Sequence, residues 1–330
     1  MRYYLQFSAK LICSLLLIFY HFGSLAQVSF TTFHKQDGDE TKQRDSAYFS
    51  RTVHMLGEGE GRYYTIEEFY TRNDSIKLKA DSRKPKPSFE YLGTKYEFYE
   101  DGKLKSLENY STDSQLIDSA FYLYPNNTLE MIVFYPNYVD KKGKIKVQKP
   151  IYVVYYDSLK NKTLENGNGR IRFKYHNDYE EGRMLNSMRE GEWKGKFGKS
   201  STVENYSKDK LIAGLKMKTS GEIIKYDSTT YRVNPQYPGG ISRLMGFISS
   251  HYRYPKEALK RGVSGTVEIG FTVDKEGNVK DFVVKQDLGY GTGEEGIRVV
   301  KQAGKWKPGI QRGEPVNVRY TLPIRLNSTR

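Results

Sequence analysis

A glycine-rich stretch near the C-terminus is the first candidate for chemistry. Gly291–Gly296 fits the pattern GxGxxG, whose backbone can hold a dinucleotide pyrophosphate at the start of a helix, and Glu314 lies downstream. Two of its residues, Glu294 and Glu295, would repel a pyrophosphate at that point. Only one further strand is expected after this helix, which is too few for a dinucleotide-binding sheet. We therefore expect a turn and a helix start here, not a cofactor site.

The remaining polar residues show no catalytic or metal-binding spacing. His34, His54 and His176 are scattered, and a lone histidine is typically an ordinary surface residue. The carboxylates Glu180 and Glu181 belong to no motif, and the sequence contains no GxSxG, HExxH or P-loop pattern. A hydrolase built from scattered carboxylates has nothing to support it. We expect no enzymatic activity, no cofactor and no metal.

The N-terminus has the features of a secretory signal. Arg2 and Lys10 precede a mostly apolar run over residues 11–22, and residues 24–26 end the segment in a small-x-small pattern. The twelve residues of the run span about 18 Å as a helix, less than the roughly 30 Å core of a bilayer. We expect cleavage after Ala26, and a cysteine-free exported chain fits a soluble location in a bacterial envelope. If the segment is not cleaved, the chain would be anchored in the inner membrane.

Composition narrows the class of protein further. Of the 330 residues, 37% are hydrophobic and 28% are charged, which excludes a membrane protein with many helical spans. The single cysteine, Cys13, excludes a disulfide framework. The net charge is +14, and residues 232–330 contribute +8 of it. Basic charge and many aromatic side chains can indicate single-strand nucleic-acid binding, but an exported protein meets little nucleic acid, so we expect none.

The middle of the chain repeats an aromatic pair, a turn and an aliphatic strand. Tyr99 and Tyr124 are 25 residues apart, and each is followed five positions later by a leucine. Tyr206 and Leu211 show the same step. The turns contain Asp-Gly and Asn-Asn, which tolerate the positive φ of tight hairpins. A period in the twenties indicates stacked hairpins, each too small to bury its own face.

These units resemble MORN-type hairpin repeats, in particular the variant repeats of antitoxin-like envelope proteins. The clearest match is Gly191–Gly195, with the sequence GEWKG, followed by Glu204–Tyr206. The resemblance covers residues 62–231 and implies an elongated array. An ordinary twisted antiparallel sheet would show the same tyrosine rows and stays open as an alternative. Residues 27–61 are mostly polar, and we expect a linker or a frayed first strand there.

The last hundred residues contain three expected helices. An apolar stripe at helical spacing follows Pro238–Gly240 and consists of Ile241, Leu244, Met245 and Ile248. The second, shorter helix has Pro255 near its first turn and Gly262 just past its end. The third is expected to begin with a capping box of Thr292 and Glu295.

Three segments of this region alternate apolar and polar residues, as half-buried strands do. They cover residues 266–273, 278–286 and 316–326, and a turn at Asp274–Gly277 joins the first two. A right-handed crossover through the third helix makes the second and third strands parallel, with the first strand between them. We therefore expect a mainly β chain: a hairpin-repeat region, then a small α+β domain over residues 232–330. Its sheet would be three-stranded, antiparallel or mixed, with the helices on one face.

This region resembles the C-terminal domain of TonB. The resemblance lies in six segments within residues 233–326: Pro235–Gly240, Tyr254–Ala258, Gly262–Val267, Val273–Asp274 with Gly277, Lys305–Gly309 and Leu322–Ile324. Together with the export signal and the repeats, the chain is similar to envelope proteins of the Bacteroidetes type. The resemblance implies an energy transducer of TonB-dependent transport, located in the periplasm of a Gram-negative bacterium. Its partner would be the TonB box, a peptide segment of outer-membrane transporters.

Pro323 indicates that the last strand lies at an edge of the sheet, because proline cannot donate to a ladder. An open edge can take up an extended peptide as a further strand. By resemblance that peptide is the TonB box, which the segment around Arg253 would also meet. The expected peptide-binding residues are Arg253, Tyr254, Pro255, Val316, Asn317, Val318, Arg319, Tyr320, Thr321 and Leu322. A proline replacing Val318 is expected to abolish binding and leave the fold largely intact.

Departures from the TonB pattern leave two interpretations open. The family's anchor pairs a serine and a histidine one helical turn apart, whereas Ser14 and His21 are seven residues apart, and the proline-rich spacer is missing. In the first interpretation the protein takes part in TonB-dependent transport and, if anchored, couples to an ExbB/ExbD-type proton channel. In the second it is an envelope adaptor without an energy source, which joins one partner at its repeats to another at its edge strand. The exposed edge would also allow two copies to pair as a homodimer.

Overall fold

The computed structural model describes residues 28–57, 62–84 and 89–327, so the expected signal over residues 1–26 lies outside the described residues. The chain divides into two compact units: Met1–Ile171 with Met184–Ser187, and Arg172–Arg183 with Met188–Arg330. The division falls within the hairpin of β14 (Asn168–Tyr175) and β15 (Asp178–Leu185). Strands account for 55% of the described residues and helices for 11%, which confirms the mainly β fold. The domain boundaries expected at residues 61 and 231 stay predictions.

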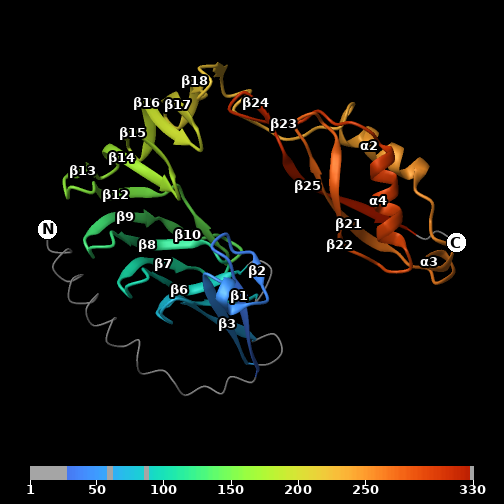
Figure 1. Ribbon diagram of the computed structural model, residues 1–330, viewed down its shortest axis with the longest axis horizontal. Helices are drawn as coiled ribbons and strands as arrows, with labels where there is room; N and C mark the ends of the chain where they lie inside the picture. The colour runs from blue at the N-terminus through green and yellow to red at the C-terminus, as the bar shows by residue number, and fades with distance from the viewer. Residues whose placement is uncertain (1–27, 58–61, 85–88, 328–330) are drawn as a thin grey trace. The chain divides into compact units, whose positions relative to one another are not determined.

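The first unit is built of antiparallel hairpins (Figure 1). Its elements are β1 (Val28–His34), β2 (Glu40–Thr41), the short 3-10 helix η1 (Arg44–Ser46), β3 (Phe49–Leu56), β4 (Tyr63–Tyr70), β5 (Ile76–Ser82), β6 (Tyr91–Phe98), β7 (Leu104–Tyr110), β8 (Leu116–Leu123), β9 (Leu129–Tyr135), β10 (Asn137–Val139), β11 (Ile145–Val147), β12 (Ile151–Tyr156) and β13 (Lys162–Glu165). From β3 to β9 each strand pairs with the next strand in the chain, and β9 then pairs with β12. Within residues 27–61, where a linker or a frayed first strand is expected, β1 pairs with β3 and adds a strand to the sheet.

A row of tyrosines connects one hairpin to the next. The hydroxyls of Tyr70 and Tyr99 donate to the backbone oxygens of Phe98 and Leu123, at 2.9 and 2.6 Å. Tyr124 repeats the contact one hairpin further along. Burial raises the pKa of Tyr70 and of Tyr99 to about 12, so both hydroxyls remain donors at neutral pH. The 25-residue step from Tyr99 to Tyr124 is thus one of the steps between these inter-hairpin contacts.

His34 is buried, contrary to its expected surface position. It is 3% exposed, and its ring stacks on Phe49 with the ring centroids 4.9 Å apart. Its two ring nitrogens lie 2.8 Å from Thr32 Oγ1 and 3.0 Å from the backbone oxygen of Gly38. Burial lowers the pKa of His34. The sequence alone does not reveal this because the burial follows from the pairing of β1 with β3.

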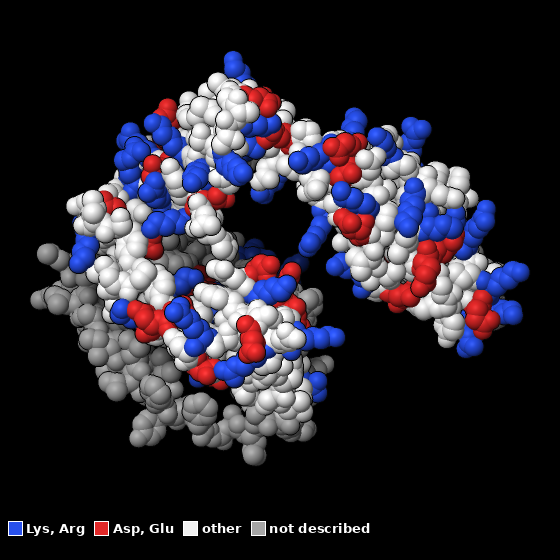
Figure 2. All heavy atoms as spheres, in the orientation of Figure 1, with Lys and Arg blue, Asp and Glu red and all other residues white. Residues whose placement is uncertain are grey.

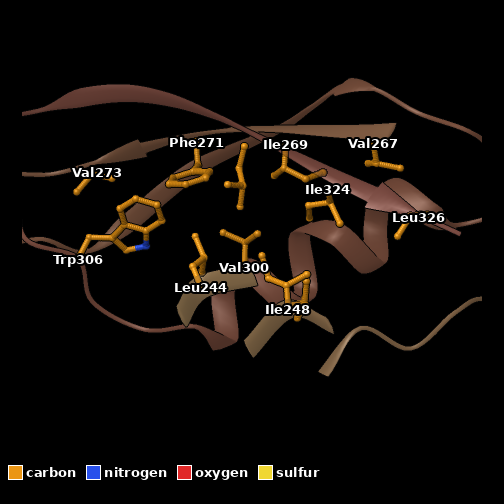
Figure 3. Packing of buried hydrophobic residues seen from close by; sticks show 12 residues of the cluster. Leu244, Ile248, Val267, Ile269, Phe271, Val273, Val300, Trp306, Ile324 and Leu326 are labelled. Atoms are coloured by element: carbon orange, nitrogen blue, oxygen red, sulfur yellow. The ribbon is translucent and has the colours of Figure 1, made fainter. Parts of the chain in front are cut away.

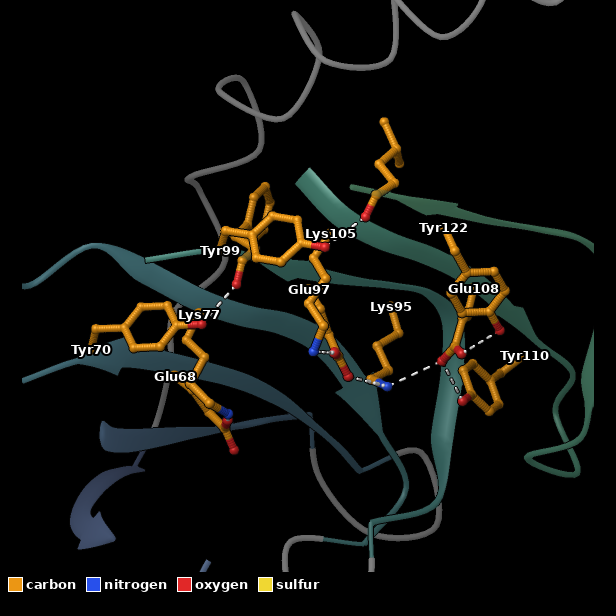
Figure 4. Close-up of polar contacts among 12 residues, drawn as sticks. Glu68, Tyr70, Lys77, Lys95, Glu97, Tyr99, Lys105, Glu108, Tyr110 and Tyr122 are labelled. Carbon is orange, nitrogen blue, oxygen red and sulfur yellow. Dashed lines mark hydrogen bonds and ion pairs between the residues drawn. The ribbon is translucent and has the colours of Figure 1, made fainter. Parts of the chain in front are cut away.

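Charged side chains bridge β6 and β7 in the same unit (Figure 4). Glu108 accepts hydrogen bonds from the hydroxyls of Tyr110 and Tyr122, each at 2.9 Å, and from Lys95 at 3.1 Å. Lys95 also lies 2.7 Å from Glu97, whose second oxygen is 3.1 Å from Lys105. Burial alone would raise the pKa of Glu97, but the two lysines outweigh it and lower that pKa to about 2.

Replacing Glu97 by glutamine is expected to reduce acid resistance. Since the carboxylate titrates near pH 2 when folded and near 4.3 when unfolded, its stabilisation is complete above about pH 4.3 and is lost as the pH falls toward 2. We expect Glu97→Gln to cost on the order of 2 kcal/mol at pH 7, after allowance for solvent screening, and nothing near pH 2. Urea unfolding from pH 2 to 7 measures this. An equal cost at both ends of that range would contradict it.

The second unit contains the last hairpins and the C-terminal domain. Its elements are β16 (Met188–Phe197), β17 (Ser200–Ser207), β18 (Lys210–Met217), β19 (Ile223–Tyr226), β20 (Arg232–Val233), α2 (Gly240–His251), α3 (Lys256–Lys260), β21 (Gly265–Val273), β22 (Val279–Gln286), α4 (Thr292–Gln302), β23 (Gly309–Gln311), β24 (Glu314–Val316) and β25 (Val318–Leu326). Strands β16 to β19 again pair antiparallel in chain order. Trp193, in the GEWKG segment, is 1% exposed and packs between Phe173 and Tyr206.

The C-terminal domain contains the expected three-stranded sheet, in the order β22-β21-β25. Both pairings are antiparallel, so β22 and β25 run parallel on either side of β21. The β21–β25 register runs without interruption from Gly265↔Leu326 to Val273↔Val318. The predicted strand order and the edge position of the last strand are therefore confirmed. The last strand begins at Val318, however, because Val316 pairs with Gly309 in the small sheet of β20, β23 and β24.

Helices α2 and α4 cover one face of this sheet and enclose the core with it (Figure 3). The buried side chains are Leu244, Ile248, Val267, Ile269, Phe271, Val273, Val299, Val300, Trp306, Leu322, Ile324 and Leu326. Gly296 lets α4 approach closely, since a Cβ there would lie 2.9 Å from Ile269. Of the stripe predicted for α2, Leu244 and Ile248 are buried, but Ile241 is 51% exposed at the first turn.

The capping box expected at α4 is wrong. The N-cap is Gly291, at φ 84°, and Glu295 instead accepts a hydrogen bond from the backbone N–H of Arg253, at 2.6 Å. Asp287, in the preceding loop, accepts hydrogen bonds from the Thr292 hydroxyl (2.7 Å) and the Gly293 N–H (3.0 Å). A carboxylate from outside the helix thus accepts hydrogen bonds from donors in its first turn. The local capping pattern could not reveal this partner.

The tip of the β23–β24 hairpin inserts beside β17, β18 and β19. Arg312, at the tip, is 8% exposed and donates from Nε to Glu204 Oε1 at 2.8 Å. Glu204 also accepts the hydroxyls of Tyr206 (2.8 Å) and Tyr226 (2.6 Å). Burial and the Glu204 carboxylate raise the pKa of both tyrosines, so they stay hydroxyl donors. The last hairpins and the C-terminal domain are thus joined by a fully paired buried cluster.

Candidate peptide-binding edge

Strand β25 is an edge strand of the sheet, because the only pairing it makes among the described residues is with β21. Leu322, Ile324 and Leu326 point into the core, and the residues between them are exposed. Tyr320 packs against Trp306 and Phe271, with ring centroids 5.2 and 5.7 Å apart. One side of β25 is therefore held rigidly while its outer backbone edge is open.

Pro323 shows which backbone groups of β25 point outward. It sits opposite Glu268 in an uninterrupted ladder, so its position must be one that donates nothing to β21. N–H groups alternate sides along a strand, so Arg319 and Thr321 direct theirs to the open edge as well. Val318, Tyr320 and Leu322 direct theirs toward β21. The backbone N–H groups that can pair with a peptide are therefore those of Arg319 and Thr321.

A groove of about 570 Å³ lies on the sheet face opposite the helices. It is lined by Gly270, Phe271, Thr272, Asp281, Val283, Lys285, Asn317, Arg319, Tyr320 and Thr321. Gly270 is needed there, since a Cβ would lie 2.9 Å from Val283 and 3.0 Å from Lys285. Lys and Arg cover more of the visible face of the C-terminal domain than Asp and Glu do (Figure 2). An extended chain laid along β25 would thus pass a groove with more cations than anions.

The structure brings most of the predicted residues together but separates two groups. Asn317, Arg319, Tyr320 and Thr321 line the groove together, and Leu322 lies in the core beneath them. Val316 belongs to β24, and Asn317 Oδ1 accepts the Lys275 N–H at 3.1 Å, which marks the break between the two strands.

The second group lies in the loop between α2 and α3. The Arg253 backbone donates to Glu295 on α4, and the Tyr254 hydroxyl donates to the Val263 oxygen. Pro255 occupies the N-cap of α3, near Gly291. These contacts are with the helix layer, so the loop and β25 form two separate candidate surfaces.

Lys285 and Asp281, which line the groove from β22, were missed in the sequence. The alternating pattern of this strand puts both residues on its polar face. A polar face predicts solvent exposure but not a binding groove. The two residues line the same groove as Arg319 and Thr321 of β25 because the pairing of β22 with β21 carries bulges, which no sequence pattern marks.

A small α+β domain with an open edge strand defines a class of domain suited to extended peptides. Residues 250–327 match the family described as the Gram-negative bacterial TonB protein C-terminal, and this part of the chain is a TonB C-terminal domain. The segment Pro235–Gly240, which also carried the resemblance, lies before the matched residues.

The solution structure of the Helicobacter pylori TonB C-terminal domain is similar at 26% sequence identity. The similarity covers 27% of this chain and 94% of that one, with a TM-score of 0.22. No curated protein sequence matches the chain. The matched family supports a TonB-like role in TonB-dependent transport and a location in the cell envelope or periplasm. No helix within the described residues is long and apolar enough to cross a membrane.

Proposed function

We propose that this protein is a non-enzymatic TonB-like component that binds the TonB box of outer-membrane transporters by strand addition along β25. The observation that supports it most directly is the uninterrupted pairing of β25 with β21 on one side only, with outward N–H groups at Arg319 and Thr321. A peptide added there would gain main-chain hydrogen bonds, and its side chains would face the groove on one side.

Replacing Thr321 by proline is expected to weaken peptide binding about 10- to 100-fold. The change removes one outward N–H and places a ring in the path of the added strand, a loss of about 1–3 kcal/mol. The pairing with β21 should survive, as it does at Pro323. Anisotropy titrations with labelled TonB-box peptides, checked by circular dichroism, measure both effects.

Thr321→Val is the matched control, because it keeps the N–H and the β-branched shape. Unchanged affinity of the proline variant would contradict strand addition at this edge. The Val318→Pro substitution expected from the sequence is at the wrong position: Val318 pairs with Val273 and directs its N–H toward β21. It would disturb the sheet itself, and its loss of binding would carry no information about the edge.

We also propose that the N-terminal segment is a cleaved signal, which gives a periplasmic protein starting at Gln27. The support is the sequence pattern of residues 1–26. Intact mass after cell fractionation tests it: a full-length chain in the inner-membrane fraction would instead favour coupling to an ExbB/ExbD-type channel. The adaptor interpretation applies if the mature chain is soluble.

A homodimer through β25 would use the same edge as the peptide. The molar mass measured by light scattering should therefore fall from dimer toward monomer as peptide is added.

A further inference from the structure

The β10–β11 hairpin leaves the main sheet and forms a small sheet of its own. We call residues 136–150 the arm. The chain departs after Tyr135, at the end of β9, and returns at Ile151, the start of β12. A two-stranded hairpin is only marginally stable alone in water, so a projecting one is a costly feature to keep without a partner surface.

The arm is strongly basic. It contains five lysines and one aspartate, a net charge of +4, and no arginine. Asp140 is engaged in the turn, where its Oδ1 accepts the backbone N–H groups of Lys142 (2.8 Å) and Lys144 (3.0 Å). These hydrogen bonds lower the pKa of Asp140, so it remains an anion, but its ion pair with Lys146 is long at 3.9 Å. Lys141, Lys142 and Lys144 are exposed at the tip.

Apolar side chains accompany this charge. On the arm, Tyr138 is 52% and Val139 is 65% exposed. At its base, Phe134 and Ile151 face each other across β9 and β12 and are 37% and 41% exposed. Exposed aromatic and aliphatic groups surrounded by lysine are the combination that lies at the headgroup level of a bilayer.

We propose that the arm binds the surface of an anionic phospholipid bilayer. The use of lysine alone favours this over a defined acceptor on a protein. Arginine suits bidentate recognition of a fixed carboxylate, whereas lysine is a point charge on a flexible stem that matches a diffuse anionic surface. Lysines next to an anionic leaflet each contribute about five-fold in partitioning. Tyr138 and Val139 would enter the interface while the tip lysines lie among the headgroups.

The test is co-sedimentation of the whole chain with sucrose-loaded vesicles of phosphatidylcholine alone and of phosphatidylcholine with a quarter phosphatidylglycerol. We expect binding to the anionic vesicles that falls steeply as salt is raised from 50 to 300 mM. Any vesicle binding through the apolar N-terminal segment would occur with both lipid compositions. Only the difference between the two vesicles is therefore assigned to the arm. Equal binding to the two vesicles would overturn the proposal.

Replacing Lys141, Lys142, Lys144 and Lys146 by glutamine is expected to reduce partitioning at least 30-fold. The control replaces four exposed lysines of β16–β18 and their turns, Lys194, Lys196, Lys199 and Lys210, by glutamine, with the same change in net charge. A similar loss in the control would show that only total charge matters and would overturn the assignment to the arm. So would tighter binding of the arm to soluble polyglutamate than to the vesicles, since that would identify an acidic polypeptide as the partner.

Discussion

Replacing Arg312 by alanine is expected to lower the free energy of unfolding by about 3–5 kcal/mol, because it leaves the Glu204 carboxylate buried without its cation. The two side chains are only 9% and 3% exposed, so water cannot substitute for the lost partner. The guanidinium also lies 3.8 Å from the ring centre of Phe197, and that contact is lost as well. The damage should be confined to the junction between the last hairpins and the C-terminal domain.

Fluorescence can localise the effect, since the two tryptophans, Trp193 and Trp306, report on the hairpins and on the C-terminal core. In urea their transitions should coincide in the wild type and separate in Arg312→Ala. Lys194→Ala is the control: its ion pair with Glu192 is exposed, with side chains 64% and 61% accessible, and should change stability by less than about 0.5 kcal/mol. Arg312→Met with Glu204→Gln should recover part of the loss. Strictly additive single effects would show that the pair is not coupled.

Replacing Trp193 by alanine is expected to cost about 3–5 kcal/mol through the cavity it leaves. The indole is stacked on Phe173 at 5.9 Å, and its Nε1–H donates to the Arg183 backbone oxygen at 3.0 Å. Arg189 covers it from 4.7 Å. Urea unfolding followed by circular dichroism measures the loss. A cost below about 1 kcal/mol would mean that the site collapses around the smaller side chain.

Gly182 supplies a paired test of the same packing. A Cβ at residue 182 would lie 2.4 Å from the Trp193 ring, so Gly182→Ala should cost about 1–3 kcal/mol in the wild type. In the Trp193→Ala background the same methyl group would enter the vacated space and cost little. An equal cost in both backgrounds would show that the added methyl group strains the backbone of β15 and does not clash with the indole.

The parts of the fold that could be predicted are those specified by short-range patterns. Alternation in β21 and β25 placed Val267, Ile269 and Leu322 in the core, and Pro323 placed β25 at an edge. The tyrosine step predicted the hairpin repeat, whose resemblance to MORN repeats stays a prediction. Each of these features depends on residues within about 25 positions of one another.

What could not be predicted depends on long-range contacts. Glu204 and Arg312 are 108 residues apart, and neither lies in a pattern that implies a partner. The same is true of His34, which is buried only because β1 pairs with β3. For the candidate site, the sequence predicted the edge strand. The direction of its N–H groups and the position of Lys285 and Asp281 in the groove could be read only from the register of the sheet. The capping box failed because an outside carboxylate, Asp287, took the place of the local residue.

The order of the strands has a consequence for how the chain acquires its structure. From β3 to β9 every strand meets its immediate successor, so each loop closure is short and hairpins can form within microseconds as the chain is synthesised. The C-terminal sheet differs, because its central strand, β21, pairs with β25. Val267 can pair with Ile324 only after the last strand has been synthesised. Synthesis order therefore becomes assembly order. The hairpins mature one at a time, the edge strand β25 comes last, and a prematurely terminated chain would carry the arm but no edge strand.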